Sequence, residues 1–111
     1  MLIHLDEDIF EVVKNGTKKV EMRLYDEKRQ KLKKGDIITF LKRPDDKEKI
    51  NAVIENLSYY DRFEDLINDY PIEELYLKNY SKDDLLNLLR RFYSEEDEKI
   101  YGTVAISFKK I

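Results

Sequence analysis

The sequence contains no cysteine and only one histidine, His4. The absence of cysteine excludes disulfide bonds, thiolate zinc sites and cysteine nucleophiles, and a single histidine excludes a histidine-rich metal site. No apolar run approaches the roughly 18 residues that a membrane-spanning helix needs, and the N-terminus has no signal-peptide pattern. We therefore expect a soluble cytoplasmic protein that uses no cofactor, no metal and no membrane.

Glycine and proline are scarce, with three and two copies, and each lies where a helix or strand should end. The chain has no repeats, no low-complexity tract and no linker, so its 111 residues predict a single domain over residues 1–111. Hydrophobic residues make up 41% of the chain, which excludes a wholly disordered protein. Charged residues make up another 41%, well above the roughly 25% of an ordinary domain.

The charges are distributed unevenly along the chain. Residues 14–34 contain nine Lys and Arg against three Asp and Glu, a balance of +6, whereas the remainder contains 12 against 21, a balance of −9. A local excess of positive charge indicates an anion-binding face even where the net charge, here −3, is negative. The alternative interpretation is a solvated basic surface that binds nothing.

Hydrophobic spacing predicts strands near both ends of the chain and helices in its second half. Alternating or short apolar segments indicate strands at residues 1–5, 18–24, 37–41, 49–59 and 103–108. Helical spacing indicates helices at about 6–15, 63–70 and 81–92, with another turn from residue 94. In the helix that Ser81 begins, we expect one buried stripe, formed by Leu85, Leu88, Leu89 and Phe92. This order predicts the α+β class, as a small mixed or antiparallel β-barrel of about five strands flanked by helices.

The strand at residues 18–24 carries the main candidates for a binding site. Alternation directs its apolar residues to the core and places Lys19, Glu21 and Arg23 on a polar face, each about 7 Å from the next. An arginine offers a planar fork for a phosphate or a base edge, and a lysine offers a point charge. The carboxylate between them can orient the arginine or accept a hydrogen bond from an exocyclic amine. Mutually compensating charges on a solvated strand face are the structural alternative.

Further cations and tyrosines flank this strand, and bases stack on aromatic side chains. Tyr25 follows the strand directly. In the pair Tyr59-Tyr60, strand geometry leaves only one ring free, and we take Tyr60 as the candidate. The candidate nucleic-acid-binding residues are therefore Lys18, Lys19, Glu21, Arg23, Tyr25, Lys28, Arg29 and Tyr60.

Patterns for catalysis are few. His4 has no Ser-His-Asp pattern around it, and we expect it to be a strand or packing residue. Three isolated glycines cannot form a phosphate-binding loop. Only Lys18 or Lys19 beside Glu21 could transfer a proton, and only if burial shifts a pKa. We therefore assign no catalytic residue and keep Lys18 with Glu21 as the alternative.

Two parts of the chain have a distinctive order and spacing of residues. One is GTKKVEMRLYDEKRQKLKKGD at residues 16–36, and the other combines RFYSEE at 91–96 with YGTVAI at 101–106. Together they resemble the ASCH (activating signal cointegrator homology) domain family over nearly the whole chain, especially its small stand-alone archaeal and bacterial members. The resemblance implies a PUA-like β-barrel with a cleft beside the basic strand, and the binding of RNA or another nucleic acid.

The resemblance also extends to enzymes. Small ASCH-like amidohydrolases deacetylate N4-acetylcytidine with a lysine, a threonine three positions later and a distant glutamate, and other ASCH proteins are ribonucleases. The lysine aligns with Lys18, whereas the position of the threonine holds Glu21, which cannot supply a hydroxyl nucleophile. For the distant glutamate the sequence offers Glu64, Glu73 and Glu74.

The leading hypothesis is a monomeric RNA-binding module for single-stranded or modified RNA. One alternative is a hydrolase of a modified nucleoside or RNA, amidohydrolase-like or a ribonuclease, with Lys18 and Glu21 at its centre. Another is a module that binds a small molecule or a protein. Turnover would identify the enzyme, and affinity that falls steeply with salt would identify RNA binding, because phosphate contacts release counterions.

Overall fold

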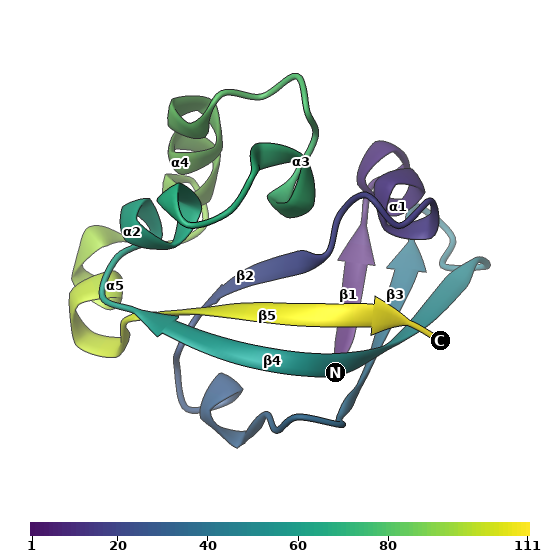
Figure 1. Ribbon diagram of the computed structural model, residues 1–111, viewed down its shortest axis with the longest axis horizontal. Coiled ribbons are helices and arrows are strands. Elements are labelled where there is room, and N and C mark those ends of the chain that lie inside the picture. Colours follow the sequence, from purple (N-terminus) through teal and green to yellow (C-terminus); the bar gives the residue numbers. More distant parts are fainter.

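The computed structural model describes residues 1–111 and contains one mixed sheet with helices on its surface (Figure 1). The strands are β1 (Leu2–Leu5), β2 (Val20–Leu24), β3 (Ile37–Lys42), β4 (Lys49–Tyr60) and β5 (Thr103–Lys110). The helices are α1 (Glu7–Lys14), α2 (Phe63–Asn68), α3 (Ile72–Leu75), α4 (Lys82–Arg90) and α5 (Glu95–Tyr101), with a short 3-10 helix η1 (Arg29–Lys31). The predicted α+β class and five-stranded barrel-like sheet are confirmed.

The strands follow the order β1-β3-β4-β5-β2 in a curled half-barrel. β1 runs parallel to β3, and every other pair of neighbours is antiparallel. A shift of register between Ile54 and Asn56 marks a bulge in the long strand β4, and such bulges bend a strand. The two edge strands, β1 and β2, both contribute residues to one cleft, so the open side of the half-barrel is where the cleft lies.

Two hydrophobic clusters lie on opposite faces of this sheet. The inner cluster fills the half-barrel beneath α1, and the outer cluster lies between the sheet and helices α2 to α4, which gather on one side in Figure 1. Strand β5 supplies both: Val104, Ile106 and Phe108 belong to the inner cluster, and Ala105 belongs to the outer one. The strand is thus covered on both faces, with its large alternating residues on the inner face and the small Ala105 on the outer one.

Strand β2 is covered on both faces as well, which contradicts the alternative of a solvated strand face. Its apolar residues pack in the outer cluster beneath the helices. Residues opposite each other in a ladder share a face, and Glu21 is opposite Ile106 while Arg23 is opposite Val104. Because Ile106 and Val104 belong to the inner cluster, Glu21 and Arg23 point into the half-barrel rather than into open solvent.

Helix α4 is formed largely as the sequence predicts. Ser81 and Asp84 form a reciprocal capping box at its start, and Leu85 and Leu89 are buried. The prediction was wrong for Phe92, whose side chain is 72% exposed. The helix ends at Arg90, so the helical periodicity that would have buried Phe92 no longer applies there. None of the helices is long and apolar enough to cross a membrane.

Candidate nucleic-acid interface

A cleft of about 380 Å³ opens where β1 and β2 face each other, and the C-terminal part of α4 forms its outer wall. Nine of its 15 lining residues are hydrophobic, and the charged ones converge from distant parts of the chain. Mostly apolar walls with a few well-placed polar groups are typical of ligand sites. The charged groups that line it are His4, Asp6, Lys18, Glu21, Arg23 and Arg43.

Lys18 is buried at the base of this cleft, with 2% of its side chain exposed. Its Nζ donates to the carbonyl oxygens of Val20 at 2.6 Å and Leu75 at 2.7 Å, and lies 3.6 Å from Glu21 Oε1. Burial lowers the pKa of Lys18, and the neighbouring Glu21 carboxylate opposes this effect. The two hydrogen bonds and the ion pair with Glu21 hold the ammonium in place, and the bond to Leu75 ties β2 to the end of α3.

Glu21 projects from β2 beside Lys18. Its Oε1 accepts from the backbone N–H of Met22 at 3.0 Å, and its Oε2 accepts from Arg23 at 3.4 Å. Burial alone would raise the pKa of Glu21, but attraction by Lys18 and Arg23 outweighs it and holds the pKa below its ordinary value of 4.5. A carboxylate offers about four acceptor positions, so Oε2 keeps one for a ligand.

Arg23 is more accessible than Lys18 and Glu21, with 24% of its side chain exposed. Burial alone would lower the pKa of Arg23, but Glu21 and the nearby Tyr93 hydroxyl raise it, so the guanidinium stays charged. Lys18, Glu21 and Arg23 together carry a net positive charge, since two of them are cations and one is a carboxylate. The guanidinium retains donors that Glu21 does not use, and these suit an anion or the oxygen atoms of a base.

An exposed aromatic ring lies at the rim of the cleft. Phe92 lines it with 72% of its surface exposed, and the adjacent Tyr93 is fixed by stacking on Phe63, with ring centroids 5.3 Å apart. The opposite rim carries Arg43 and His4, whose Nδ1 lies 3.2 Å from Asp46. The cleft therefore combines charged groups at its base with an aromatic ring that is free to stack.

Comparisons with a family model and with solved structures match nearly the whole chain. Residues 3–111 match the family model described as the ASCH domain. The chain belongs to the ASCH domain family. ASCH domains are PUA-like and are generally associated with RNA binding.

Two solved structures resemble this ASCH domain closely. The crystal structure of hypothetical protein PH0355 matches with a TM-score of 0.84 and 37% sequence identity, over 99% of this chain and 97% of that one. The solution NMR structure of protein PF0455 from Pyrococcus furiosus matches with a TM-score of 0.76 and 33% identity, over 100% of this chain and 98% of that one. No curated protein matches the chain.

The structure of this ASCH domain brings together only some of the predicted site residues. Lys18, Glu21 and Arg23 meet in the cleft. Tyr25 and Tyr60 line a different hollow, at the far end of β2. The remaining three lie outside both: Lys19 is exposed, and Lys28 and Arg29 lie on the β2–β3 connection.

Several cleft residues of the ASCH domain were missed by the sequence analysis. Phe92 was assigned to the core, although the run Arg90-Arg91-Phe92-Tyr93 at the end of a helix combines cations with aromatic rings. His4 and Arg43 carry no sequence signal, because only the pairing of β1 with β3 brings their segments to the cleft.

The three glutamates considered for a distant catalytic role do not line the cleft. Glu64 lines a different cavity, and Glu73 and Glu74 lie in the first turn of α3. The backbone carbonyl of Glu74 accepts from Lys19 N–H at 2.9 Å, which places it in the support of β2. No group of three or more His, Asp and Glu side chains is arranged to hold a metal ion.

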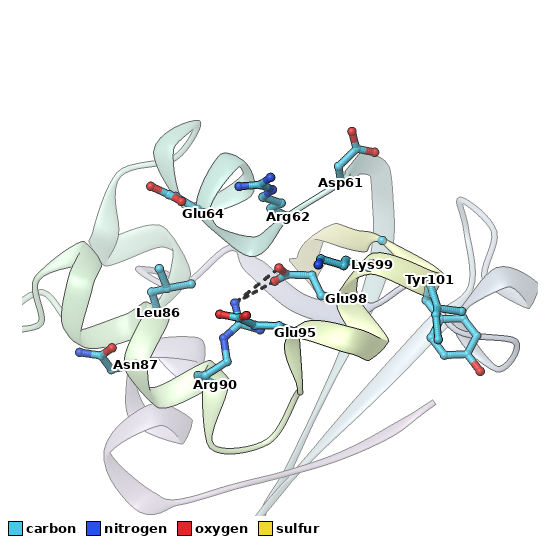
Figure 2. Close-up of a pocket in the computed structure, with 12 residues that line it drawn as sticks. Asp61, Arg62, Glu64, Leu86, Asn87, Arg90, Glu95, Glu98, Lys99 and Tyr101 are labelled. Carbon is cyan, nitrogen blue, oxygen red and sulfur yellow. Dashed lines mark hydrogen bonds and ion pairs between the residues drawn. The ribbon is translucent and has the colours of Figure 1, made fainter.

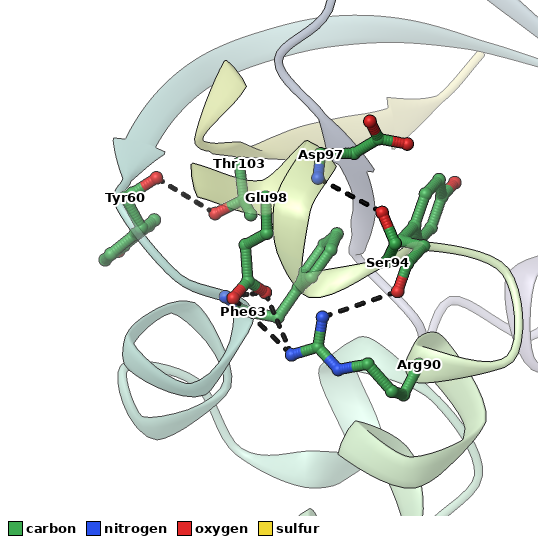
Figure 3. Close-up of polar contacts among 8 residues, drawn as sticks. Tyr60, Phe63, Arg90, Ser94, Asp97, Glu98 and Thr103 are labelled. Carbon is green, nitrogen blue, oxygen red and sulfur yellow. Dashed lines mark hydrogen bonds and ion pairs between the residues drawn. The ribbon is translucent and has the colours of Figure 1, made fainter. Parts of the chain in front are cut away.

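A larger cavity of about 820 Å³ lies among α2, α4 and α5 (Figure 2). Its central charges are already paired: Glu98, with 7% of its side chain exposed, accepts from Arg90 at 3.2 Å and from the backbone N–H of Phe63 at 3.2 Å. Arg90 also donates to the Tyr93 carbonyl at 3.3 Å, and Figure 3 shows the pairing of Arg90 with Glu98. These bonds join the three helices, so we assign this cluster to the support of the ASCH fold and the ligand site to the cleft.

Proposed function

We propose that this ASCH domain binds single-stranded RNA by receiving a nucleotide in the cleft between β1 and β2. The observation that carries the proposal is the pair Glu21 and Arg23, an acceptor and a donor held side by side at the base of the cleft. Lys18 fixes the carboxylate from behind. Recognition of RNA sequence commonly uses unstacked bases that are hydrogen-bonded at their edges and stacked on aromatic rings.

Each cleft residue has a chemical task in this proposal. Glu21 Oε2 accepts a hydrogen bond from an exocyclic amine, which cytosine, adenine and guanine have and uracil lacks. Arg23 donates to a base oxygen or a phosphate. Phe92 provides the face on which the base stacks. The excess of cations in residues 14–34 supports the approach of a polyanion.

The first test is fluorescence anisotropy of labelled single-stranded oligocytidine and oligouridine at low and moderate salt. We expect salt-dependent binding that is tighter for oligocytidine. Arg23→Ala should weaken it by about 1–3 kcal/mol, the usual value of a specific side-chain contact to a base. Lys47→Ala, which removes an exposed lysine outside both the cleft and residues 14–34, is the matched control. Equal affinity of wild type and Arg23→Ala would contradict the proposal.

The second test concerns the choice of base. Glu21→Gln replaces a carboxylate by an amide that can donate to the uracil oxygen as well as accept from cytosine. We therefore expect the preference for oligocytidine over oligouridine to shrink or reverse in this variant. An unchanged preference would show that Glu21 does not read the base edge.

The third test concerns stacking. Phe92→Ala should weaken RNA binding by about 1–3 kcal/mol, because stacking on an aromatic ring is lost. Ile100→Ala is a matched control, since Ile100 is 71% exposed and lies outside the cleft. Neither variant should unfold the protein, and equal binding by both would remove Phe92 from the site.

The hydrolase alternative requires Lys18 to exchange protons or attack a substrate. Its Nζ is held by two carbonyl oxygens and is shielded from solvent, which supports a role in positioning Glu21. The alternative is tested by running the titrated RNA on a denaturing gel and by incubating the protein with N4-acetylcytidine. Product formed by wild type and lost in Glu21→Gln would replace the binding proposal with an enzymatic one.

A further inference from the structure

We infer that the tyrosine hollow at the far end of β2, together with the basic β2–β3 connection, is a second contact for the same RNA strand. The tyrosine hollow is a depression of about 300 Å³ lined by Tyr25, Tyr59, Tyr60, Asp61, Tyr101, Gly102 and Thr103. This inference rests on the proposed function. In it, one nucleotide of a single-stranded RNA binds in the cleft and the neighbouring nucleotide binds in the tyrosine hollow.

The fold itself gathers these tyrosines. Tyr25 continues the β2 ladder, donating its N–H to the Gly102 carbonyl at 3.0 Å, and the end of β4 lies beside the start of β5, with Tyr60 opposite Thr103. Tyr101 ends α5 just before β5. Three chain segments therefore deliver four tyrosines to one end of the sheet.

One ring in this hollow is available to a base. Tyr59 is 56% exposed, and its ring lies 4.7 Å from that of Tyr25, tilted by 60°. Tyr60 is less available, since it packs against the outer cluster and its hydroxyl donates to Asp69 at 2.7 Å. The stacking residue of the Tyr59-Tyr60 pair is thus Tyr59, backed by Tyr25.

Arg23 in the cleft and Tyr25 and Tyr59 in the hollow lie on the same face of the sheet. Arg23 and Tyr25 are two residues apart on the same side of the β2 ladder, about 7 Å from each other. Val104 is opposite both Arg23 and Tyr59 in its two ladders, so Tyr59 lies two strands from Arg23, at about 10 Å. A strand with one base beside Arg23 can therefore place the next against Tyr59.

The charge beside the hollow favours a polyanion such as RNA over an apolar or basic protein partner. Gln30 of η1 donates to the Tyr25 carbonyl at 3.0 Å, which fixes the basic connection next to the hollow. Arg29 is paired with Asp26 at 3.1 Å. The other cations of the connection are exposed and form no ion pair: Lys28, Lys31, Lys33 and Lys34. Tyrosine faces beside such free cations are the elements of single-strand binding grooves.

The test separates the hollow from the cleft by ligand length. Amide chemical shifts of labelled protein are followed by NMR with cytidine monophosphate and with single-stranded octacytidine. We expect the mononucleotide to shift amides around Glu21 and Arg23 only. We expect the octamer also to shift those of Tyr25, Tyr59 and Gly102.

Variants then test stacking on Tyr59. Tyr59→Ala should weaken octacytidine binding roughly 5- to 150-fold and leave mononucleotide binding unchanged, whereas Tyr59→Phe should retain the affinity of wild type. Lys31→Ala should lower the slope of log affinity against log salt by about 0.7, since one phosphate contact is lost. The matched controls are Ile100→Ala and Lys47→Ala, which remove an exposed apolar residue and an exposed lysine elsewhere.

The possible failures are distinguishable. Octacytidine that shifts only the cleft amides, or that binds Tyr59→Ala as tightly as wild type, would overturn the hollow and leave the cleft proposal standing. Equal loss in Tyr59→Phe and Tyr59→Ala would also overturn it, because the ring would not be the binding element. A wild-type protein that binds neither ligand would overturn the proposed function and this inference together.

Discussion

The ammonium of Lys18 lies 3.6 Å from the carboxylate of Glu21, and solvent reaches only 2% and 10% of the two side chains. The pair lies where β2 meets the end of α3, because Lys18 also donates to the Leu75 carbonyl. Buried pairs cost desolvation energy, and their value depends on complete hydrogen bonding. Here two hydrogen bonds to carbonyl oxygens and the ion pair hold Lys18, so the pair forms a rigid base beneath Arg23, which faces the cleft.

Removing Lys18 should destabilise the protein strongly. Lys18→Met leaves the Glu21 charge buried with only one of its two neighbouring cations and leaves the carbonyls of Val20 and Leu75 without this donor. We expect a loss of about 3–5 kcal/mol in the free energy of unfolding, measured by urea denaturation. Lys19→Met, one residue along and exposed, should change it by less than about 0.5 kcal/mol. Similar effects of the two substitutions would contradict this account of Lys18.

Stability should fall at acidic pH through Glu21. Burial opposes its ionisation, but Lys18 and Arg23 prevail, so its folded-state pKa lies below the ordinary 4.5. Its contribution is complete above about pH 4.5, the unfolded value, and is lost as the pH falls through the folded value. Urea denaturation from neutral to acidic pH should therefore show a steeper loss for wild type than for Glu21→Gln. Parallel pH profiles would show that Glu21 does not supply this dependence.

Removing the Glu98 carboxylate should lower the stability of the protein, because this group joins α2, α4 and α5. It accepts from Arg90 on α4 and from the first backbone N–H of α2 (Figure 3). Glu98→Ala should lower the free energy of unfolding by about 1.5–3 kcal/mol, the usual contribution of hydrogen bonds to a charged group. Glu96→Ala in the same helix removes an exposed carboxylate and serves as the control. A double-mutant cycle with Arg90→Ala should show coupling of about 0.5–3 kcal/mol, and additivity would contradict the pairing.

A side chain at position 102, which holds Gly102, should destabilise the protein. Its φ of 69° and ψ of −169° belong to a region that is essentially restricted to glycine, and an added Cβ would lie 3.1 Å from the Tyr60 carbonyl. Gly102→Ala should lower the melting temperature, at a cost of about 1–3 kcal/mol. Gly35→Ala, also at positive φ but in open space, should cost less. A larger effect at Gly35 would contradict the contact with Tyr60.

Local patterns in the sequence were sufficient to predict most elements of this fold. The spacing of Leu85 and Leu89, the Ser81 cap and the alternation of Val104, Ile106 and Phe108 depend on neighbours in the chain. The excess of cations in residues 14–34 is likewise a property of the amino-acid order alone. The resemblance to the ASCH family came from the order of residues in 16–36, 91–96 and 101–106, and the family model that matches residues 3–111 confirms it.

The direction of the polar side chains was decided only by tertiary structure. Alternation shows that Glu21 and Arg23 share a face of β2, but the curl of the sheet turns that face inward, toward Val104 and Ile106. Lys18 became a buried group instead of a surface cation because its ammonium lies against the end of α3, where it donates to the Leu75 carbonyl.

The sequence could not predict that the candidate residues divide between a cleft and a tyrosine hollow, because this division depends on the tertiary structure. Arg23 and Tyr25 are two residues apart in the chain, yet each lines a different concavity. The exposed ring of Phe92 depends on where α4 ends. The sequence by itself determined the elements, the charge and the family, since these depend on local order. Long-range strand pairing decided where the site lies. β1 pairs with β3, β4 pairs with β5, and β2 pairs with β5, and no local pattern encodes these pairings.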